Sequence, residues 1–262
     1  MRTFRALGRY ELKNIFRDKM TALMVVYPFF ITAIAAFVIP AFFDFIEGEA
    51  AIFFTTSLVI VVILASLAPM LAGAMLGFLL LDHKDEKTLD SLRVTPLSLR
   101  SYLIYKASYT YLLSAVASAF VIFGIRWFSG DGYTFMGQNV FKELPVFGII
   151  FYALVSGLFG PTFGLIIATL GKNKIEGFAY LKSMGILILM PALVMLEAMQ
   201  DGRQYILGII PGFWPVKGLL ESASFLSDPA NLPAALYFII GALFMSGCII
   251  LFIRQFEKNV SI

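Results

Sequence analysis

The sequence predicts an all-α integral membrane protein with six transmembrane helices, and three observations support this. Hydrophobic residues make up 60% of the 262 residues and charged residues only 14%, which is too few to cover a soluble domain. Six apolar stretches can each cross a hydrocarbon core that needs about 20 helical residues. Basic residues gather in alternate connecting segments. Helix is the expected conformation because lipid offers backbone groups no partner and the stretches lack the alternation of barrel strands.

The six predicted spans cover residues 20–43, 52–81, 105–125, 144–170, 183–199 and 233–253. Four of them contain an interior proline, which lacks the N–H that an α-helix uses and so leaves one carbonyl without its partner. These prolines are Pro28, Pro69, Pro161 and Pro191. We expect a kink at each of them, and neighbouring helices must compensate for the lost hydrogen bond.

Small residues recur at four-residue spacing in the second and fourth spans. Gly73 is followed by Gly77, and Ser156 by Gly160 and Gly164. On a helix this spacing forms a smooth face that lets a second helix approach closely. The pattern is common in proteins with many spans, so it predicts close packing and no particular function.

The distribution of basic residues predicts the orientation in the membrane. Sixteen of the twenty Lys and Arg residues lie in segments 1–19, 82–106 and 171–182 or after residue 253, and only four lie in the intervening segments. Cytoplasmic loops carry an excess of basic residues. We therefore expect a multi-pass protein of the plasma (inner) membrane with both termini in the cytoplasm.

Segment 1–19, before the first span, predicts an amphipathic helix on the inner membrane surface. At 100° per residue its apolar and basic residues fall on opposite faces. The apolar face holds Phe4, Leu7, Leu12 and Ile15, and the basic face holds Arg2, Arg5, Arg9, Lys13 and Arg17. Anionic lipid headgroups would hold the basic face. The alternative is a topology signal that happens to be helical.

The sequence lacks the residue patterns of common catalytic and metal sites. A single cysteine, Cys248, excludes a disulfide framework, and a single histidine, His83, excludes a multi-histidine metal centre. No segment matches the phosphate-binding pattern G-x-x-x-x-G-K-[ST]. The spans hold none of the residue pairs that intramembrane proteolysis uses. We therefore expect a protein that is not an enzyme, holds no cofactor or metal and binds no nucleic acid.

Four residues near the span ends are candidates for a substrate path. Tyr102, Tyr105 and Tyr109 share one face at the inner mouth of the third span, although an interfacial aromatic belt explains them as well. Glu197 is the one carboxylate inside a predicted span, and an ionisable group at membrane depth suggests function. Because it lies about one turn from the polar outer end of that span, an interfacial position is the alternative.

Segment 200–232, which precedes the last span, predicts a re-entrant element on the outer side. Residues 206–213 are apolar but too short to cross the membrane, and Pro211 and Pro215 interrupt the stretch around Trp214. Irregular backbone at membrane depth must pack against protein or a cavity. We expect this segment to enter the outer leaflet and lie against the bundle.

The loop 82–101 is the longest polar stretch between two spans on the predicted cytoplasmic side. Read as a short helix, it places Leu89 and Leu92 on one apolar edge surrounded by charge. Pro96 disfavours helix at Thr95 and so marks the end of that helix. A small amphipathic helix of this kind suits a cytoplasmic partner protein, and the alternative is a solvated connector.

This loop resembles the pattern E-R-E-x-G-T-L-x-x-L-x-x-T-P-x-S, followed by a lysine, of the ABC-2 type transporter permease family. His83 and Lys87 depart from the pattern. The amphipathic start, the six spans and the interrupted segment before the last span also fit the family, so the resemblance covers essentially the whole chain. The matching positions are Lys84, Asp85, Thr88, Leu89, Leu92, Thr95, Pro96, Ser98 and Lys106.

The resemblance implies a permease subunit of an ATP-binding cassette exporter. By this resemblance residues 1–19 correspond to the elbow helix, residues 20–262 to the six-span permease domain and residues 84–95 to the coupling helix, with Asp90 adding charge pairing. The expected partners are a cytoplasmic ATPase, which binds ATP and Mg²⁺, a second permease chain, identical or related, and membrane lipids. The family's substrates include drugs, lipids, ions and glycans.

Two further interpretations stay open. A secondary transporter needs intramembrane ionisable groups for ion coupling, and Glu197 is the one candidate for that role. A membrane scaffold would recruit a cytoplasmic protein without moving a substrate. Association with an ATPase distinguishes the exporter from the secondary transporter, and ATP-dependent movement of a substrate distinguishes it from the scaffold.

Overall fold

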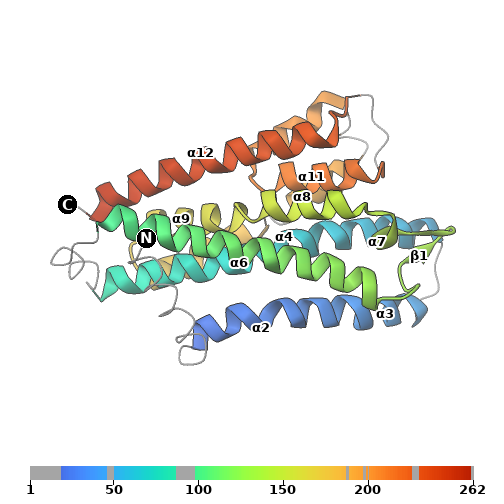
Figure 1. The fold of residues 1–262 in the computed structure, drawn as a ribbon, viewed down its shortest axis with the longest axis horizontal. Helices are drawn as coiled ribbons and strands as arrows, with labels where there is room; N and C mark the ends of the chain where they lie inside the picture. Colours follow the sequence, from blue (N-terminus) through green and yellow to red (C-terminus); the bar gives the residue numbers. More distant parts are fainter. Residues whose placement is uncertain are drawn as a thin grey trace.

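The computed structural model describes residues 19–45, 50–86, 98–186, 189–196, 199, 201–225 and 230–260, and it forms an elongated helical bundle (Figure 1). The long helices run along the longest axis of the molecule. In chain order the elements are α2 (Lys19–Ala33), the π-helix η1 (Ile34–Val38), α3 (Ile39–Phe45), α4 (Ala50–Asp85), α6 (Leu99–Phe128), β1 (Thr134–Phe135), β2 (Gln138–Asn139), α7 (Val140–Glu143), α8 (Val146–Ser156), α9 (Phe159–Leu170), α10 (Lys174–Gly185), the 3₁₀-helices η4 (Met190–Met195) and η6 (Asp201–Ile209), α11 (Phe213–Ser222) and α12 (Ala234–Val260).

Six helical segments are long and apolar enough to cross a membrane, which confirms the predicted all-α fold with six spans. They are Val26–Phe43, Ile52–Asp85, Leu99–Phe128, Val146–Leu170, Lys174–Met195 and Ala234–Val260. The fifth span differs from the prediction because it begins at Lys174 rather than at residue 183. Its first turns carry Lys174, Glu176 and Lys182, and these charges made the sequence resemble a loop.

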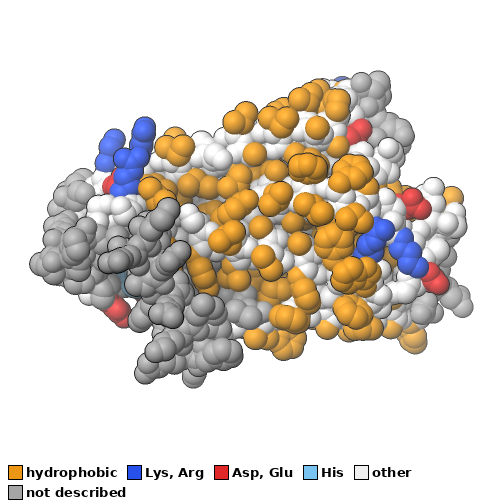
Figure 2. Space-filling model, in the orientation of Figure 1, with side chains coloured by type: hydrophobic (Ala, Val, Ile, Leu, Met, Phe, Trp, Pro, Cys, Tyr) orange, Lys and Arg blue, Asp and Glu red, His pale blue; other side chains and the backbone are white. Residues whose placement is uncertain are grey.

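The surface divides into an apolar middle and two charged ends. Figure 2 shows hydrophobic side chains over the middle of the visible face, with lysine, arginine and acidic side chains toward the two ends of the long axis. The described chain begins and ends at one of these ends (Figure 1), which we call the loop end because loop 87–97 joins α4 to α6 there. The opposite end, which carries β1 and β2, is the hairpin end.

The first span changes helix type before Pro40. The π-helix η1 replaces one stretch of α-helix, and the N–H of Ile39 bonds to the carbonyl of Ile34. The next hydrogen bond of this π-helix would run from residue 40 to the carbonyl of Ala35, but Pro40 has no N–H to donate. The hydroxyl of Tyr133 donates to the Ala35 carbonyl at 2.6 Å instead. Burial raises the pKa of the Tyr133 hydroxyl above its ordinary value, so the group stays protonated and able to donate.

A second tyrosine compensates for the proline inside α4. Pro69 cannot donate to the carbonyl of Ala65, one helical turn earlier. The hydroxyl of Tyr152 on α8, which is fully buried, donates to this carbonyl. Tyr27 on α2 bonds to the carbonyl of Ala68 at 2.8 Å. The Tyr152 side chain from a neighbouring helix therefore supplies the hydrogen bond that Pro69 was expected to require, and Tyr27 adds a second contact beside it.

Helices α4 and α9 pack closely through their glycines. A Cβ atom on Gly73 would overlap the carbonyl oxygen of Gly160, and one on Gly77 would lie 3.1 Å from the carbonyl oxygen of Gly164. This confirms that the small residues allow close packing, because the backbones meet where a larger side chain would hold them apart. We call this α4–α9 contact the glycine seam.

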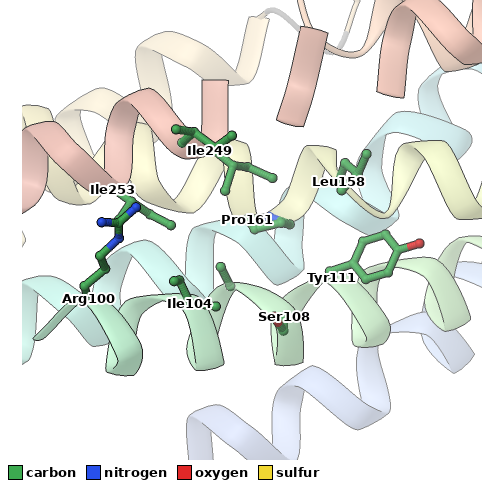
Figure 3. Close-up of a pocket in the computed structure, with 10 residues that line it drawn as sticks. Arg100, Ile104, Ser108, Tyr111, Leu158, Pro161, Ile249 and Ile253 are labelled. Carbon is green, nitrogen blue, oxygen red and sulfur yellow. The ribbon is translucent and has the colours of Figure 1, made fainter. Parts of the chain in front are cut away.

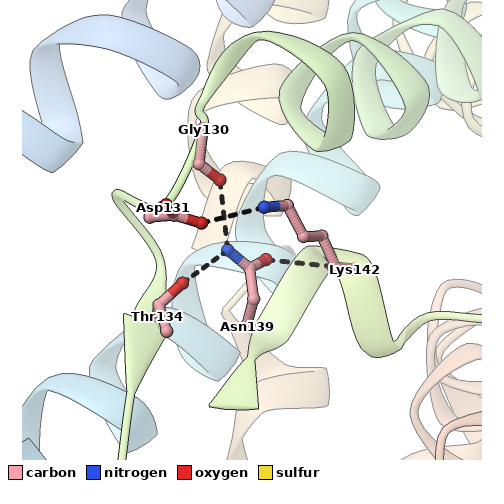
Figure 4. A network of polar contacts seen from close by, with 5 residues as sticks. All are labelled: Gly130, Asp131, Thr134, Asn139 and Lys142. Carbon is pink, nitrogen blue, oxygen red and sulfur yellow. Dashed lines mark hydrogen bonds and ion pairs between the residues drawn. The ribbon is translucent and has the colours of Figure 1, made fainter. Parts of the chain in front are cut away.

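The hairpin end is closed by a compact polar turn (Figure 4). Asn139 caps α7 by accepting from the N–H of Lys142 at 3.0 Å, and its amide donates to Thr134 at 2.8 Å and to the carbonyl of Gly130 at 3.3 Å. Lys142 pairs with Asp131 at 2.9 Å. Gly130 has a φ of +56°, which favours glycine. These contacts fix the loop that carries Tyr133 to the first span.

The segment before the last span folds into two short helices. Helix η6 leads through a turn at residues 210–212 into α11, whose Phe213, Val216 and Leu219 are buried. Helix α11 contacts α8 and α12 most extensively. The indole N–H of Trp214 donates to the carbonyl of Gly208 at 2.8 Å and holds the two short helices together.

Candidate functional site

The last turn of α4 is tied to the connection between α9 and α10. The ammonium of Lys174 lies 2.8 Å from a carboxylate oxygen of Asp82. The backbone N–H of Lys174 donates to Asp85 at 3.1 Å, and Lys84 donates to the carbonyl of Gly171 at 3.1 Å. We call these three contacts the loop-end tethers. Lys84 and Asp85, two of the predicted coupling residues, are thus the last residues of α4 and contact their own chain.

The 171–174 connection is itself held in one conformation by side-chain caps. Asn173 caps α10 and accepts from the N–H of Glu176 at 2.9 Å. The carboxylate of Glu176 accepts from the N–H of Lys172 at 2.9 Å. This arrangement resembles a capping box, in which the third helical residue returns a hydrogen bond to the start of the helix. The tethers therefore join α4 to a structured turn.

A further contact joins the two helices that flank the predicted coupling loop. The hydroxyl of Tyr102 on α6 lies 2.9 Å from Nδ1 of His83 on α4. Lys106 lies one turn further along α6, with its ammonium 5.9 Å from the centre of the Tyr102 ring. The Tyr102 side chain is buried. It therefore connects α4 with α6, and the ends of both helices are positioned relative to each other.

Helix α12 joins the same end of the bundle. The amide of Asn259 donates to the carbonyl of Thr169, near the end of α9, at 3.1 Å. With the loop-end tethers and the His83–Tyr102 contact, this links the loop-end termini of α4, α6, α9, α10 and α12. A displacement of α4 at this end would therefore act on several spans together.

Much of the predicted coupling segment lies outside the described residues. This applies to Thr88, Leu89, Asp90, Leu92, Thr95 and Pro96, to the candidate Glu197 and to the amphipathic segment 1–18. Among the remaining candidates, Tyr105 is buried and Tyr109 is half-buried. Their proposed contact with a substrate stays a prediction.

A groove runs along one side of the bundle between α6, α9 and α12, with a volume of about 280 Å³. Four side chains of α6 form one wall at helical spacing, namely Arg100, Ile104, Ser108 and Tyr111. Ala107 completes this wall, Leu158 and Pro161 at the start of α9 contribute from the fourth span, and Ile249, Ile250 and Ile253 of α12 form the opposite wall. Figure 3 shows these side chains around the groove, with Arg100 at one end and Tyr111 near the other.

The chemistry of the groove differs along its length. Apolar side chains dominate it, Ser108 and Tyr111 add hydroxyl groups, and Arg100 places a guanidinium at the loop end. In the part of the chain that the structure describes, no carboxylate forms an ion pair with Arg100. Of the aromatic residues on this helix, Tyr111 lines the groove, whereas the predicted Tyr102, Tyr105 and Tyr109 are absent from its lining.

A buried polar cluster at α11 was missed by the sequence analysis. Lys217 is only 2% exposed, and its ammonium lies 6.0 Å from the centre of the Tyr237 ring. The hydroxyls of Tyr237 and Tyr205 lie 3.0 Å apart, and Asn231 donates to Glu221 at 2.8 Å. We call these residues the α11 cluster. The lysine inside an apolar run and the Glu221 one turn later were the sequence signals for it.

The residues that the structure describes do not form a metal-binding site. Across the described ranges, no group of three or more His, Cys, Asp or Glu residues is placed to hold a metal ion. The arrangement has two features that can be described chemically: a mostly apolar groove with one guanidinium, and helix ends that are joined by ion pairs and hydrogen bonds at the loop end.

Comparison with known proteins agrees with a transport role. Residues 11–253 match the family model described as fluoroquinolones export permease protein Rv2686c-like. Two curated relatives from Mycobacterium tuberculosis are named fluoroquinolones export permease protein, MT2760 from strain CDC 1551 and Rv2686c from strain H37Rv. Each is 26% identical over 221 residues, which cover 82% of this chain and 81% of the relative. No solved structure matches the chain.

Proposed function

Because this chain belongs to the Rv2686c-like family of fluoroquinolone export permeases, we propose that it is the membrane subunit of an exporter driven by a separate ATPase. Its six spans form the path through the membrane. The ATPase binds ATP and Mg²⁺ on the cytoplasmic side. The excess of basic residues in alternate segments supports placing the loop end in the cytoplasm and the protein in the plasma (inner) membrane.

The observation that carries this proposal is the set of loop-end tethers. Loop 87–97 leaves α4 directly after Asp82, Lys84 and Asp85, which bind the 171–174 connection. A partner that pulls on this loop would move α4 together with α9 and α10. The coupling segment therefore acts through a braced helix end, as a mechanical input from an ATPase requires.

The permease works as a pair of six-span chains in this proposal, either two identical copies or two relatives. The outer faces of several spans are apolar and open to lipid or to a partner, because Phe29, Phe37, Leu243 and Leu251 are more than half exposed. Lipid or a second chain covers these faces. The transported compounds, by likeness to the named relatives, are amphiphilic drugs of the fluoroquinolone class.

A gradient-driven secondary transporter is the second candidate, and one observation favours it. Lys217 and Glu221 bring ionisable groups into the buried α11 cluster, and ionisable groups at membrane depth often mark ion pathways. The exporter is preferred because α11 lies toward the hairpin end (Figure 1), away from the loop end, where the helix ends are joined by the tethers. ATP-dependent uptake into inverted vesicles distinguishes the two, since a secondary transporter responds to an ion gradient instead.

The coupling segment is tested by a double variant, Leu89→Asp with Leu92→Asp. Burying two leucine side chains in a partner contributes about 3 to 6 kcal/mol, so the variant should no longer co-purify with the ATPase, while the spans still insert. Met136→Asp is the matched control, because Met136 is an exposed apolar residue at the hairpin end, 71% accessible. A double variant that keeps its ATPase and exports normally would make the loop a simple connector.

A further inference from the structure

We propose that the groove between α6, α9 and α12 is the site where a transported molecule enters from the cytoplasmic leaflet, and that this molecule is an amphiphile with an apolar body and one carboxylate. Arg100 binds the carboxylate. The inference rests on the proposed function for its direction of transport and for the position of the loop end. It adds the substrate chemistry and the route of entry.

The position of the groove makes it accessible from lipid. Ile104 and Ile250, on opposite walls, are 44% and 52% exposed. Further along α6 the apolar surface continues with Leu112 and Val116, which are 62% and 66% exposed. A molecule dissolved among the acyl chains can therefore reach the groove sideways, without first crossing a polar entrance.

The size of the groove suits one small molecule. Its volume of about 280 Å³ lies near the lower end of ligand pockets, roughly 300 to 1,000 Å³. Arg100 and Tyr111 are eleven residues apart on α6, which corresponds to about 16 Å along the helix axis. A rigid apolar body of a few rings would fill this length between the guanidinium at one end and the aromatic ring near the other.

The charge in the groove selects an anion. A guanidinium presents parallel N–H donors that match the two oxygens of a carboxylate. Among the described residues that line the groove, Arg100 carries the one charged side chain, and it lies at the loop end of the groove (Figure 3). The proposed orientation places this end beside the cytoplasmic headgroups. An amphiphile would keep its carboxylate at this level of the membrane while its apolar part lies between Ile104 and Ile250.

The lining also connects the ligand with the coupling machinery. Leu158 lies at the break between α8 and α9, and Pro161 is one residue from Gly160 of the glycine seam. Helix α4 on the other side of the seam ends at the loop-end tethers. A ligand that pushes on the start of α9 therefore acts on the helix that carries the coupling loop, and the proposal predicts that substrate stimulates ATP hydrolysis by the partner.

The test measures binding to the full chain, purified with its ATPase in phosphatidylcholine nanodiscs without ATP. The probes are 1-pyrenebutyric acid and its methyl ester, with empty discs subtracted. Arg100→Gln should weaken binding of the acid by about 10- to 100-fold, as loss of a hydrogen bond to a charged group predicts, and should leave ester binding unchanged. Arg100→Lys should restore part of the affinity for the acid. Ile250→Trp fills the groove and should weaken binding of both probes.

Arg254→Gln is the matched control, because Arg254 is an exposed basic residue at the loop end of α12 that does not line the groove. The inference is overturned if Arg100→Gln affects acid and ester equally, if neither groove variant changes binding, or if the wild-type chain binds neither probe. It is also overturned if Arg100 retains an anionic phospholipid that the pyrene acid does not displace. The Leu89→Asp, Leu92→Asp variant separates the two proposals: it should bind both probes normally even where export is lost.

Discussion

The glycine seam and the groove are two helix contacts of the same bundle with opposite outcomes. In an apolar 18-residue stretch of each of the second and fourth spans, 72% of residues are buried, and the backbones of α4 and α9 meet at Gly73 and Gly160. In the corresponding stretches of the third and sixth spans only 39% and 28% are buried, and α12 diverges from α6 in Figure 1. All four spans are strongly apolar, so hydrophobicity does not decide which pair closes.

The difference teaches that small side chains, rather than apolar ones, set helix contacts in this protein. Lipid solvates an isoleucine as well as another helix does, so isoleucines on α12 gain little from reaching α6. Glycines gain contact because the backbones approach. We therefore expect the seam to be the rigid part of the molecule, and the groove to be the part that can accept a ligand.

The largest loss of folded protein is expected when a bulky side chain separates the two helices of the glycine seam. Gly73→Leu places a branched side chain against the carbonyl of Gly160, and overpacking of this kind costs about 1 to 3 kcal/mol or more when backbone must move. We expect the variant to lose its monodisperse peak in size-exclusion chromatography. Ser108→Leu adds a similar volume in the groove and should elute like the wild type. Equal yields of both folded variants would show that the seam is not the rigid part.

An intermediate effect is expected from the tyrosine that compensates for Pro69. Tyr152→Phe leaves the buried carbonyl of Ala65 without the side-chain donor, which should lower the free energy of unfolding by about 1 to 2 kcal/mol. Tyr111→Phe removes a hydroxyl from the groove and should change it by less than about 0.5 kcal/mol. Reversible unfolding in mixed micelles measures both. A neutral Tyr152→Phe would mean that the carbonyl finds another donor.

The smallest effect is expected at the loop-end tethers. The side chains of Lys174 and Asp82 are 42% and 34% exposed, so their ion pair contributes only about 0.2 to 1 kcal/mol after solvent screening. Asp82→Asn should therefore barely change unfolding, while ATP hydrolysis stimulated by substrate falls because α4 moves without α10. Asp131→Asn removes the more exposed ion pair with Lys142 at the hairpin end. This variant should change neither the free energy of unfolding nor the stimulation of ATP hydrolysis. Full stimulation of ATP hydrolysis in Asp82→Asn would show that this ion pair does not transmit motion from α4 to α10.

The features that could be predicted are those that depend on residues close together in the sequence. The six spans follow from runs of apolar residues, and the need to compensate for Pro69 follows from the chemistry of proline. The start of the fifth span was wrong because Lys174, Glu176 and Lys182 lie within its helix. A single sequence shows such charges but not whether the helix continues through them.

The groove could not be predicted in the same way. It depends on the angle between α6 and α12, which lie far apart in the sequence and both pack against α9. Arg100 therefore resembled an ordinary basic loop residue, and the aromatic candidates Tyr102, Tyr105 and Tyr109 do not line the groove, whereas Tyr111 does. Lys217 was not selected as a candidate because the prediction for its segment rested on the prolines and on the length of the apolar stretch.

The ion pair between Asp82 and Lys174 joins two residues that are synthesised at different times. The two residues are 92 positions apart, and synthesis at about 5 to 20 residues per second delays the second by roughly 5 to 18 s. During this interval the second span is already made, with an unpaired carboxylate at one end and Gly73 facing no helix. The glycine face of the second span therefore lacks its native partner until the fourth span has been synthesised.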